Sequence, residues 1–227
     1  MPKQEPPIAI PPAAPHAAAY AGLIFAILFT LSIVLIRHAM PGTLSEVLSE
    51  RTDITVSRSL IIGLNLLPFA GIAFLWFIGV IRDYIGNRED RFFATVILGS
   101  GLLFIAMLFV AAGIAGSLVT SITNASNPVD VETFLFGRAM SNTLAYVYGA
   151  RMAGVFMIST SMLTRRVELI PRWLAWLGVL FAVILLLGIR SQEWILLLFP
   201  LWVFIFSVYI LRTPHPPVLP AHPGEGE

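Results

Sequence analysis

The sequence predicts an all-α membrane protein, a polytopic bundle of about six transmembrane helices. Hydrophobic residues make up 57% of its 227 residues and charged residues only 12%, whereas a soluble domain carries about 25% charged residues. The apolar residues also form long runs, and about 20 of them in a helix cross a hydrocarbon core about 30 Å thick. The spans predicted from these runs cover residues 18–36, 59–81, 92–119, 134–162, 173–189 and 194–211.

The two ends of the chain differ in composition from the spans. Residues 1–17 are rich in proline and alanine, and residues 213–227 are rich in proline. Because proline at this density neither forms a helix nor buries apolar surface, we expect two disordered tails around one transmembrane domain, residues 18–212. The first apolar run lacks a basic segment before it and a small-residue cleavage site after it. It is therefore expected to be an anchor and not a signal peptide.

The connections between spans have ordinary structural explanations. Between the first two spans, residues 43–50 place apolar side chains on one helical face, which is typical of a short helix on the membrane surface. Before the third span, Gly86 can end one helix, and Asn87 with Asp90 can cap the next. Pro171 suits the first turn of the fifth span. The arginines of the turn TRRVELIPRW are explained by the positive-inside pattern.

The distribution of Lys and Arg predicts that both termini are cytoplasmic. The side shared by the tails carries twice as many basic residues as the other, and cytoplasmic flanks of spans carry the excess. Trp76, Trp173 and Tyr209 then lie near the inner interface and Trp194 near the outer one, as interfacial aromatic residues do. The inner basic residues are Lys3, Arg82, Arg88, Arg91, Arg165, Arg166, Arg172 and Arg212, and the outer ones are Arg37, Arg51, Arg58 and Arg190.

Small residues recur every four positions along the fourth span. Helices in lipid associate by close packing, so small residues mark buried interfaces. The third span also carries small residues, which makes it the expected neighbour. The small residues are Gly137, Ser141, Ala145, Gly149 and Ala153 on the fourth span, and Gly99, Gly101, Ala112, Gly113 and Gly116 on the third.

Arg138 and Arg151 interrupt the same span. At 100° per residue, Arg138, Asn142 and Gly149 fall within about 40° of one another, whereas Arg151 lies about 140° from Arg138. Arg138 lies about one turn from the outer boundary, where its guanidinium can reach the interface. Asp130, Glu132 and Glu193 are predicted on that side and could pair with it.

Arg151 is predicted to lie within the hydrocarbon region, about 21 Å from the cytoplasmic end of its helix at 1.5 Å per residue. A charge there costs at least about 2.5 to 3.5 kcal/mol, and none of the six predicted spans contains Asp or Glu. Compensation must come from backbone carbonyls, polar side chains, water or a bound anion. Pro68 leaves a carbonyl near residue 64 without its usual donor, and that carbonyl is one expected partner. The side-chain candidates are Asn65, Ser100, Tyr146 and Tyr148.

The residues for most known chemistries are missing from the sequence. The histidines lie outside the spans without metal-ligand spacing, the only lysine is Lys3, and there is no cysteine. The hydroxyls of Ser159, Thr160 and Ser161 have no neighbouring base and are expected to bond to the backbone one turn earlier. A net charge of +1 gives no basic surface for nucleic acid. We therefore expect no enzyme activity, no cofactor, no metal and no nucleic-acid partner.

Four segments carry a family resemblance, and together they cover roughly residues 18–212. They are LLPFAGIAFLWFIGVIRDYIGNREDRFFATVILGSGLLF, ARMAGVFMISTSMLTRR, IPRWLAWLG and FPLWVFIFSVYIL. In these segments the chain resembles a family of small multi-span membrane proteins, mostly from actinobacteria, that has no assigned activity. The resemblance implies a helical bundle in a bacterial inner (plasma) membrane and nominates no catalytic residue.

Two functions are consistent with this sequence. The first is a non-catalytic component of a membrane assembly, such as a scaffold, an accessory subunit or a lipid-binding component. Its expected partners are the lipid bilayer, an anionic lipid, other membrane subunits or a second copy of the chain. The alternative is a small transporter or channel for an anionic or amphipathic solute with Arg151 at its site, although the spans lack the carboxylate or histidine that carries protons in coupled transporters.

Overall fold

The computed structural model describes residues 14–39, 54–85, 91–123, 130–188 and 193–213, and its regular structure in these ranges is entirely helical. The all-α prediction is therefore confirmed. Each predicted span coincides with a helix or with an unbroken run of helices, to within about a turn. The elements are α1 (Ala14–Ala39), α3 (Ile54–Ile85), α4 (Arg91–Thr123), α5 (Val131–Thr143), η3 (Leu144–Gly149), α6 (Ala150–Arg166), α7 (Arg172–Leu187), η4 (Glu193–Leu197) and α8 (Leu198–Arg212).

Several helix boundaries differ from the predicted ones. Helix α1 begins at Ala14, inside the predicted tail, because Pro15 in a first turn needs no backbone donor. Pro171 is extended and precedes α7, where its carbonyl accepts hydrogen bonds from the backbone N–H groups of Leu174 and Ala175. The predicted surface helix at 43–50 and the caps at 86–90 lie outside the described residues.

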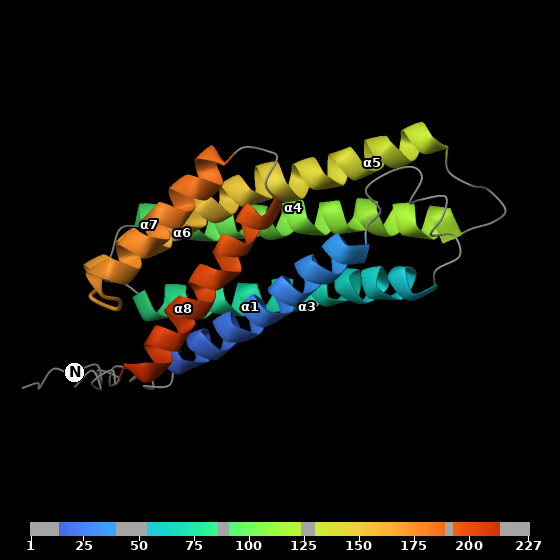
Figure 1. Ribbon diagram of the computed structural model, residues 1–227. Coiled ribbons are helices and arrows are strands. Elements are labelled where there is room, and N and C mark those ends of the chain that lie inside the picture. Colours follow the sequence, from blue (N-terminus) through green and yellow to red (C-terminus); the bar gives the residue numbers. More distant parts are fainter. Residues whose placement is uncertain (1–13, 40–53, 86–90, 124–129, 189–192, 214–227) are drawn as a thin grey trace, which may run out of the picture.

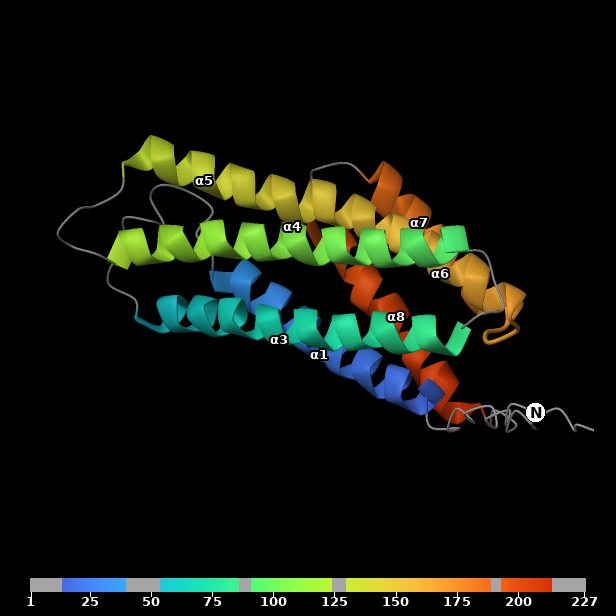
Figure 2. The same cartoon turned by 180° about the vertical axis from the view of Figure 1, so that it is seen from behind.

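The helices form a closed ring (Figures 1 and 2). Around the ring, α1 packs against α3, α3 against α4, α4 against α6, α6 against α7, α7 against α8 and α8 against α1. Most neighbours in space are therefore neighbours in sequence, as short connections favour. Helix α8 closes the ring by crossing back to α1.

Helix α1 begins and α8 ends at the same end of the bundle, where α6 also ends and α7 begins (Figure 1). We call this the terminal end and the other the distal end. Helices α3, α4 and the run from α5 to α6 extend toward the distal end beyond α7 and α8 (Figures 1 and 2). The distal half of α5 thus has α4 as its main neighbour.

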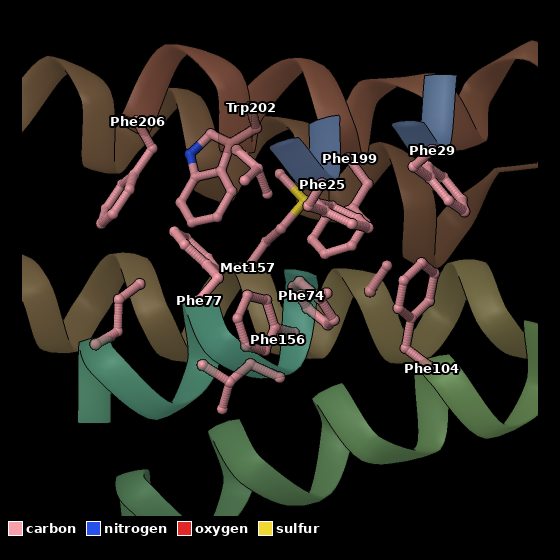
Figure 3. Packing of buried hydrophobic residues seen from close by; sticks show 14 of the residues in the cluster. Phe25, Phe29, Phe74, Phe77, Phe104, Phe156, Met157, Phe199, Trp202 and Phe206 are labelled. Carbon is pink, nitrogen blue, oxygen red and sulfur yellow. The ribbon is translucent and has the colours of Figure 1, made fainter. Parts of the chain in front are cut away.

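Aromatic rings fill the centre of the ring of helices (Figure 3). The Phe74 ring on α3 lies 4.7 Å from Phe25 on α1, 5.6 Å from Phe104 on α4, 5.0 Å from Phe156 on α6 and 5.4 Å from Phe199 on α8, measured between ring centroids. Most of these pairs meet edge to face, the arrangement that aromatic quadrupoles favour. One side chain therefore joins five helices.

The outer surface of the bundle is also apolar. Phe69 is 62% exposed and Trp76 69% exposed, and exposed Ile, Leu and Phe side chains recur along the helices. Monomeric soluble proteins rarely expose such patches. Helices long and apolar enough to cross a membrane cover His16–His38, Arg58–Arg82, Phe92–Ser121 and Trp194–Arg212, and a shorter apolar helix covers Arg172–Leu187. The bundle thus has the composition of a membrane protein.

Replacing Phe74 by Ala should destabilise the protein by about 3 kcal/mol or more, because a large cavity would open where five helices meet. Phe69→Ala on the same helix is the control, since Phe69 faces outward and its loss should change stability by about 0.5 kcal/mol or less. Thermal unfolding of both variants in one detergent measures the difference. Equal stability of the two variants would contradict the packing described above.

Candidate functional site

The predicted fourth span is one continuous helical run with a π-helix at its centre. Helix α5 passes without a break into η3, a π-helix over Leu144–Gly149, and then into α6. The backbone N–H of Ala150 donates to the carbonyls of Ala145 and Val147. Single π-turns inside α-helices are rare and frequently occur at functional sites. This one lies between Arg138 and Arg151.

The spacing of the small residues explains the π-helix. Residues four apart on an α-helix drift by about 40° per step, so the series from Gly137 to Ala153 would turn through about 160°. The wider π-turn accommodates an extra residue and removes about 100° of this drift. Accordingly Ser141, Ala145, Gly149 and Ala153 are all buried. The π-helix keeps the small residues inside the bundle.

Contacts with α4 follow this series of small residues. The Ser141 hydroxyl donates to the Ala111 carbonyl of α4 at 2.9 Å. A methyl group added at Gly137 would lie 2.9 Å from Leu118, and one added at Gly149 would lie 3.9 Å from Met107 Cβ. The structure thus places the third and fourth spans side by side, as expected.

Most of the residues of α4 that make this contact differ from the predicted ones. Gly99 and Gly113 have open space around them, Gly116 faces Leu64 of α3, and Gly101 lies between Ile78 of α3 and Phe156 of α6. We call the contact between α4 and the fourth span the seam. Larger side chains of α4 fill the seam because the fourth span already supplies the small ones. The expectation that Gly149 shares a face with Arg138 and Asn142 assumed α-helical phase, and the π-turn moves Gly149 away from them.

Arg151 is exposed on the outer surface of the described bundle. Its Nη1 donates to the Val147 carbonyl in the π-helix at 3.0 Å. Gly149, two residues earlier, packs at Met107, which is halfway along α4. Helix α7 packs along α6 with Leu186 against Gly154 and ends at Leu187. Arg151 therefore lies level with the middle of α4 and close to the level at which α7 ends.

The partners expected for Arg151 make other contacts. Asn65 Nδ2 donates to the Ile61 carbonyl of its own helix at 2.8 Å, and Ser100 Oγ donates to Val96 at 2.6 Å. A backbone carbonyl does accept a hydrogen bond from Arg151, but this carbonyl belongs to Val147 and not to residue 64. Pro68 favoured the carbonyl near residue 64, whereas the π-helix presents the Val147 carbonyl to Arg151.

The other candidate residues lie around the π-helix in different surroundings. Tyr148 is 56% exposed, and Tyr146 packs partly buried against the core. Arg138 and Asn142 are half-buried on the distal side of η3. The pairing of Arg138 with Asp130, Glu132 or Glu193 stays a prediction.

Sequence reasoning missed a second polar feature at the terminal end. Thr164 Oγ1 donates to the Thr160 carbonyl as expected of a helical hydroxyl, but Thr160 Oγ1 and Ser161 Oγ are buried without any hydrogen-bond partner among the described residues. The expectation that both hydroxyls bond to the backbone one turn earlier is therefore wrong. Ser161 lines a groove between α6 and α7 together with Arg165 and Arg166. In the sequence, the only indication of this polar feature was the arginine-rich turn TRRVELIPRW that follows Thr160 and Ser161.

That turn has a well-defined C-capping geometry. The backbone N–H of Leu169 donates to the Thr164 carbonyl at 2.9 Å, and that of Glu168 to Arg165 at 3.1 Å, which is the Schellman pattern. Glu168 adopts the left-handed conformation, with φ 58°, that this pattern requires. The cap turns the chain sharply, so that α7 runs back along α6 and a groove forms between them.

Neither polar feature has the parts of a catalytic or metal centre. Among the described residues, no group of His, Asp and Glu could hold a metal ion. Arginine side chains at both places can bind and orient an anion but remain protonated, so they serve poorly as acid or base. The arrangement is suited to recognition of an anionic group.

No family model, curated protein or solved structure matches this chain.

Replacing Ser141 by Ala should destabilise the protein by about 0.5–1.5 kcal/mol, because it removes a hydrogen bond between two helices at the buried seam. Ser117→Ala is the matched control. The Ser117 hydroxyl donates to Gly113 of its own helix and is exposed, so its removal should leave stability almost unchanged. Unfolding temperatures in detergent would compare the two, and an equal loss would contradict a specific role for the seam.

Proposed function

We propose that this protein is a non-catalytic, six-span component of a bacterial inner membrane and that it acts as an accessory subunit of a membrane assembly. The observation that carries the proposal is the exposed Arg151, level with the middle of the long apolar helix α4. A cation at that depth needs an anion or a polar surface. None of the six predicted spans of the chain holds a carboxylate.

The partner we propose is another membrane protein whose transmembrane helix carries an acidic side chain. A second copy of this chain is a poorer fit, because its spans have no carboxylate to offer at the depth of Arg151. From Arg151 toward the distal end, the helical run has exposed aromatic side chains, with Tyr148 in η3 56% exposed and Phe136 in α5 70% exposed. Aromatic and arginine side chains are the residues most enriched where proteins bind tightly.

The shortness of α7 supports the same location for the partner. Helix α7 has 16 residues, about 24 Å at helical rise, and ends near the level of Arg151. Beyond that level α5 continues toward the distal end with α4 as its main neighbour. A partner helix can therefore approach α5 and η3 from the side that α7 leaves uncovered.

The basic residues support six spans with cytoplasmic termini. Arg82, Arg165, Arg166, Arg172 and Arg212 are exposed and belong to helix ends at the terminal end. An excess of arginine marks the cytoplasmic side.

Topology can be measured directly because the chain contains no cysteine. Single cysteines would replace Lys3, Gly224 and Ala125, and intact spheroplasts would be treated with a membrane-impermeant maleimide. We expect labelling of Ala125→Cys alone, with Lys3→Cys and Gly224→Cys reacting only after lysis. Labelling of either tail in intact spheroplasts would contradict cytoplasmic termini.

Arg151→Gln should separate the protein from its partner, because glutamine is uncharged and cannot form the ion pair. The protein would be purified from its own membranes in mild detergent, with Arg151→Lys as the charge-conserving control and Arg138→Gln as the control at the other arginine. We expect at least a tenfold loss of partner binding for Arg151→Gln and a smaller loss for both controls. Exchanging the charges, with Arg151→Glu and the partner's carboxylate replaced by Arg, should restore the complex.

Three results would overturn the accessory-subunit proposal. The first is a solitary monomer, the second is a homodimer, and the third is a complex that survives Arg151→Gln. Anion flux by the purified protein in proteoliposomes, abolished by Arg151→Gln, would instead support the alternative of a small transporter or channel.

A further inference from the structure

A groove at the terminal end has a built polar lining that the Arg151 proposal does not use. It lies between α6 and α7, opens to the surface and has a volume of about 470 Å³. Its lining includes Arg165, Arg166 and Ser161 from α6 and Trp176 and Val179 from α7. This volume lies in the range of small-ligand sites, about 300–1,000 Å³.

Two positively charged arginines line the groove, and the guanidinium group of each lies over an aromatic ring. The guanidinium carbon of Arg165 lies 5.8 Å from the centroid of the Trp176 ring across the groove, and that of Arg166 lies 4.9 Å from the Phe93 ring of α4. A ring face attracts a cation without neutralising it. Both guanidinium groups therefore keep N–H donors for an anion, and guanidinium forks match phosphate oxygens well.

Ser161 belongs to the inner wall of the groove and carries a buried hydroxyl. Its side chain is fully buried and its Oγ has no hydrogen-bond partner in the described part of the chain. A buried hydroxyl without a hydrogen bond lowers the stability of the folded protein. The hydroxyl lies beside Gly178, so it would reach a ligand oxygen in the groove by rotation of the Ser161 side chain.

The Ser161 hydroxyl is closely packed against Gly178 of α7 and lies near Trp202 of α8. A methyl group added at Gly178 of α7 would collide with Ser161 Oγ and lie 2.5 Å from Trp202 Nε1 of α8. The indole Nε1 of Trp202 is also buried without a partner. Glycine at position 178 thus lets α6, α7 and α8 meet at a buried polar point next to the groove.

The rest of the lining is apolar and continues into the outer surface of the bundle. Met162, Ala175 and Val179 complete the lining, and the exposed indoles of Trp173 and Trp176 lie on the same helix turns. Tryptophan favours the boundary between hydrocarbon and headgroups. A ligand that fits this groove has an anionic head and an apolar tail.

We infer that the groove between α6 and α7 binds the phosphate headgroup of an anionic phospholipid, with Arg165 and Arg166 contacting the phosphate and Ser161 donating a hydrogen bond to it. The inference depends on the membrane location proposed above but not on the partner proposed for Arg151. A basic pocket between transmembrane helices on the cytoplasmic side is a recognised place for lipid headgroups.

Lipid titration of the full-length protein in detergent tests this inference. The probes are phosphatidylglycerol, phosphatidylcholine with the same acyl chains, and inorganic phosphate, with binding followed by native mass spectrometry and by the unfolding temperature. Phosphatidylglycerol should bind at least tenfold more tightly than phosphatidylcholine. The double variant Arg165→Gln/Arg166→Gln should lose that preference, and Ser161→Ala should weaken phosphatidylglycerol binding about threefold to tenfold.

Matched variants keep the test independent of folding and of Arg151. Arg165→Lys/Arg166→Lys retains both charges and should keep most of the preference. Arg212→Gln, an exposed arginine at the same end but outside the groove, and Arg151→Gln should both bind phosphatidylglycerol like the wild type. Retained binding by Arg151→Gln, with its partner lost, would separate the two proposals.

Three outcomes would overturn the lipid site. Equal binding of the two phospholipids would show that headgroup charge is not recognised. An equal loss for Arg212→Gln would reduce the effect to general surface charge. Inorganic phosphate that displaces phosphatidylglycerol fully, with the same dependence on Arg165 and Arg166, would assign the groove to a soluble phosphate compound.

Discussion

Small residues spaced four apart, from Ser141 to Ala153, lie buried along the fourth helical run, and on a regular α-helix this series would turn through about 120° around the axis. The π-helix over Leu144–Gly149 removes most of this drift by widening the helix for one turn. Contact between this run and α4 in turn completes the ring of helices around Phe74. The packing of the whole bundle thus depends on the phase of one helix.

The same constraint determines the surroundings of Arg151. Once Ala150 and Ala153 are buried, Arg151 between them points outward, where its Nη1 reaches the Val147 carbonyl of the widened turn. A single carbonyl satisfies one donor of a group that has five. The remaining donors are what the proposed carboxylate of a partner helix would satisfy.

The groove at the terminal end depends on a separate local feature, the turn between α6 and α7. The Schellman cap after Arg166 and the close approach at Gly178 bring α7 back against α6, and the arginines at the end of α6 remain beside the gap. The two proposed sites therefore lie on one helix but are built by different parts of it. A partner at Arg151 and a lipid at Arg165 can be lost independently.

Local composition alone determined the helices, because a run of about 20 apolar residues is helical in a membrane whatever surrounds it. The small-residue series likewise identified α4 as the neighbour of the fourth span. Tertiary structure decided the rest. The phase of that span, the outward position of Arg151 and the unpartnered Ser161 each depend on how neighbouring helices pack, and helical periodicity in the sequence assumes 3.6 residues per turn throughout. One wider turn was enough to change which side chains share a face.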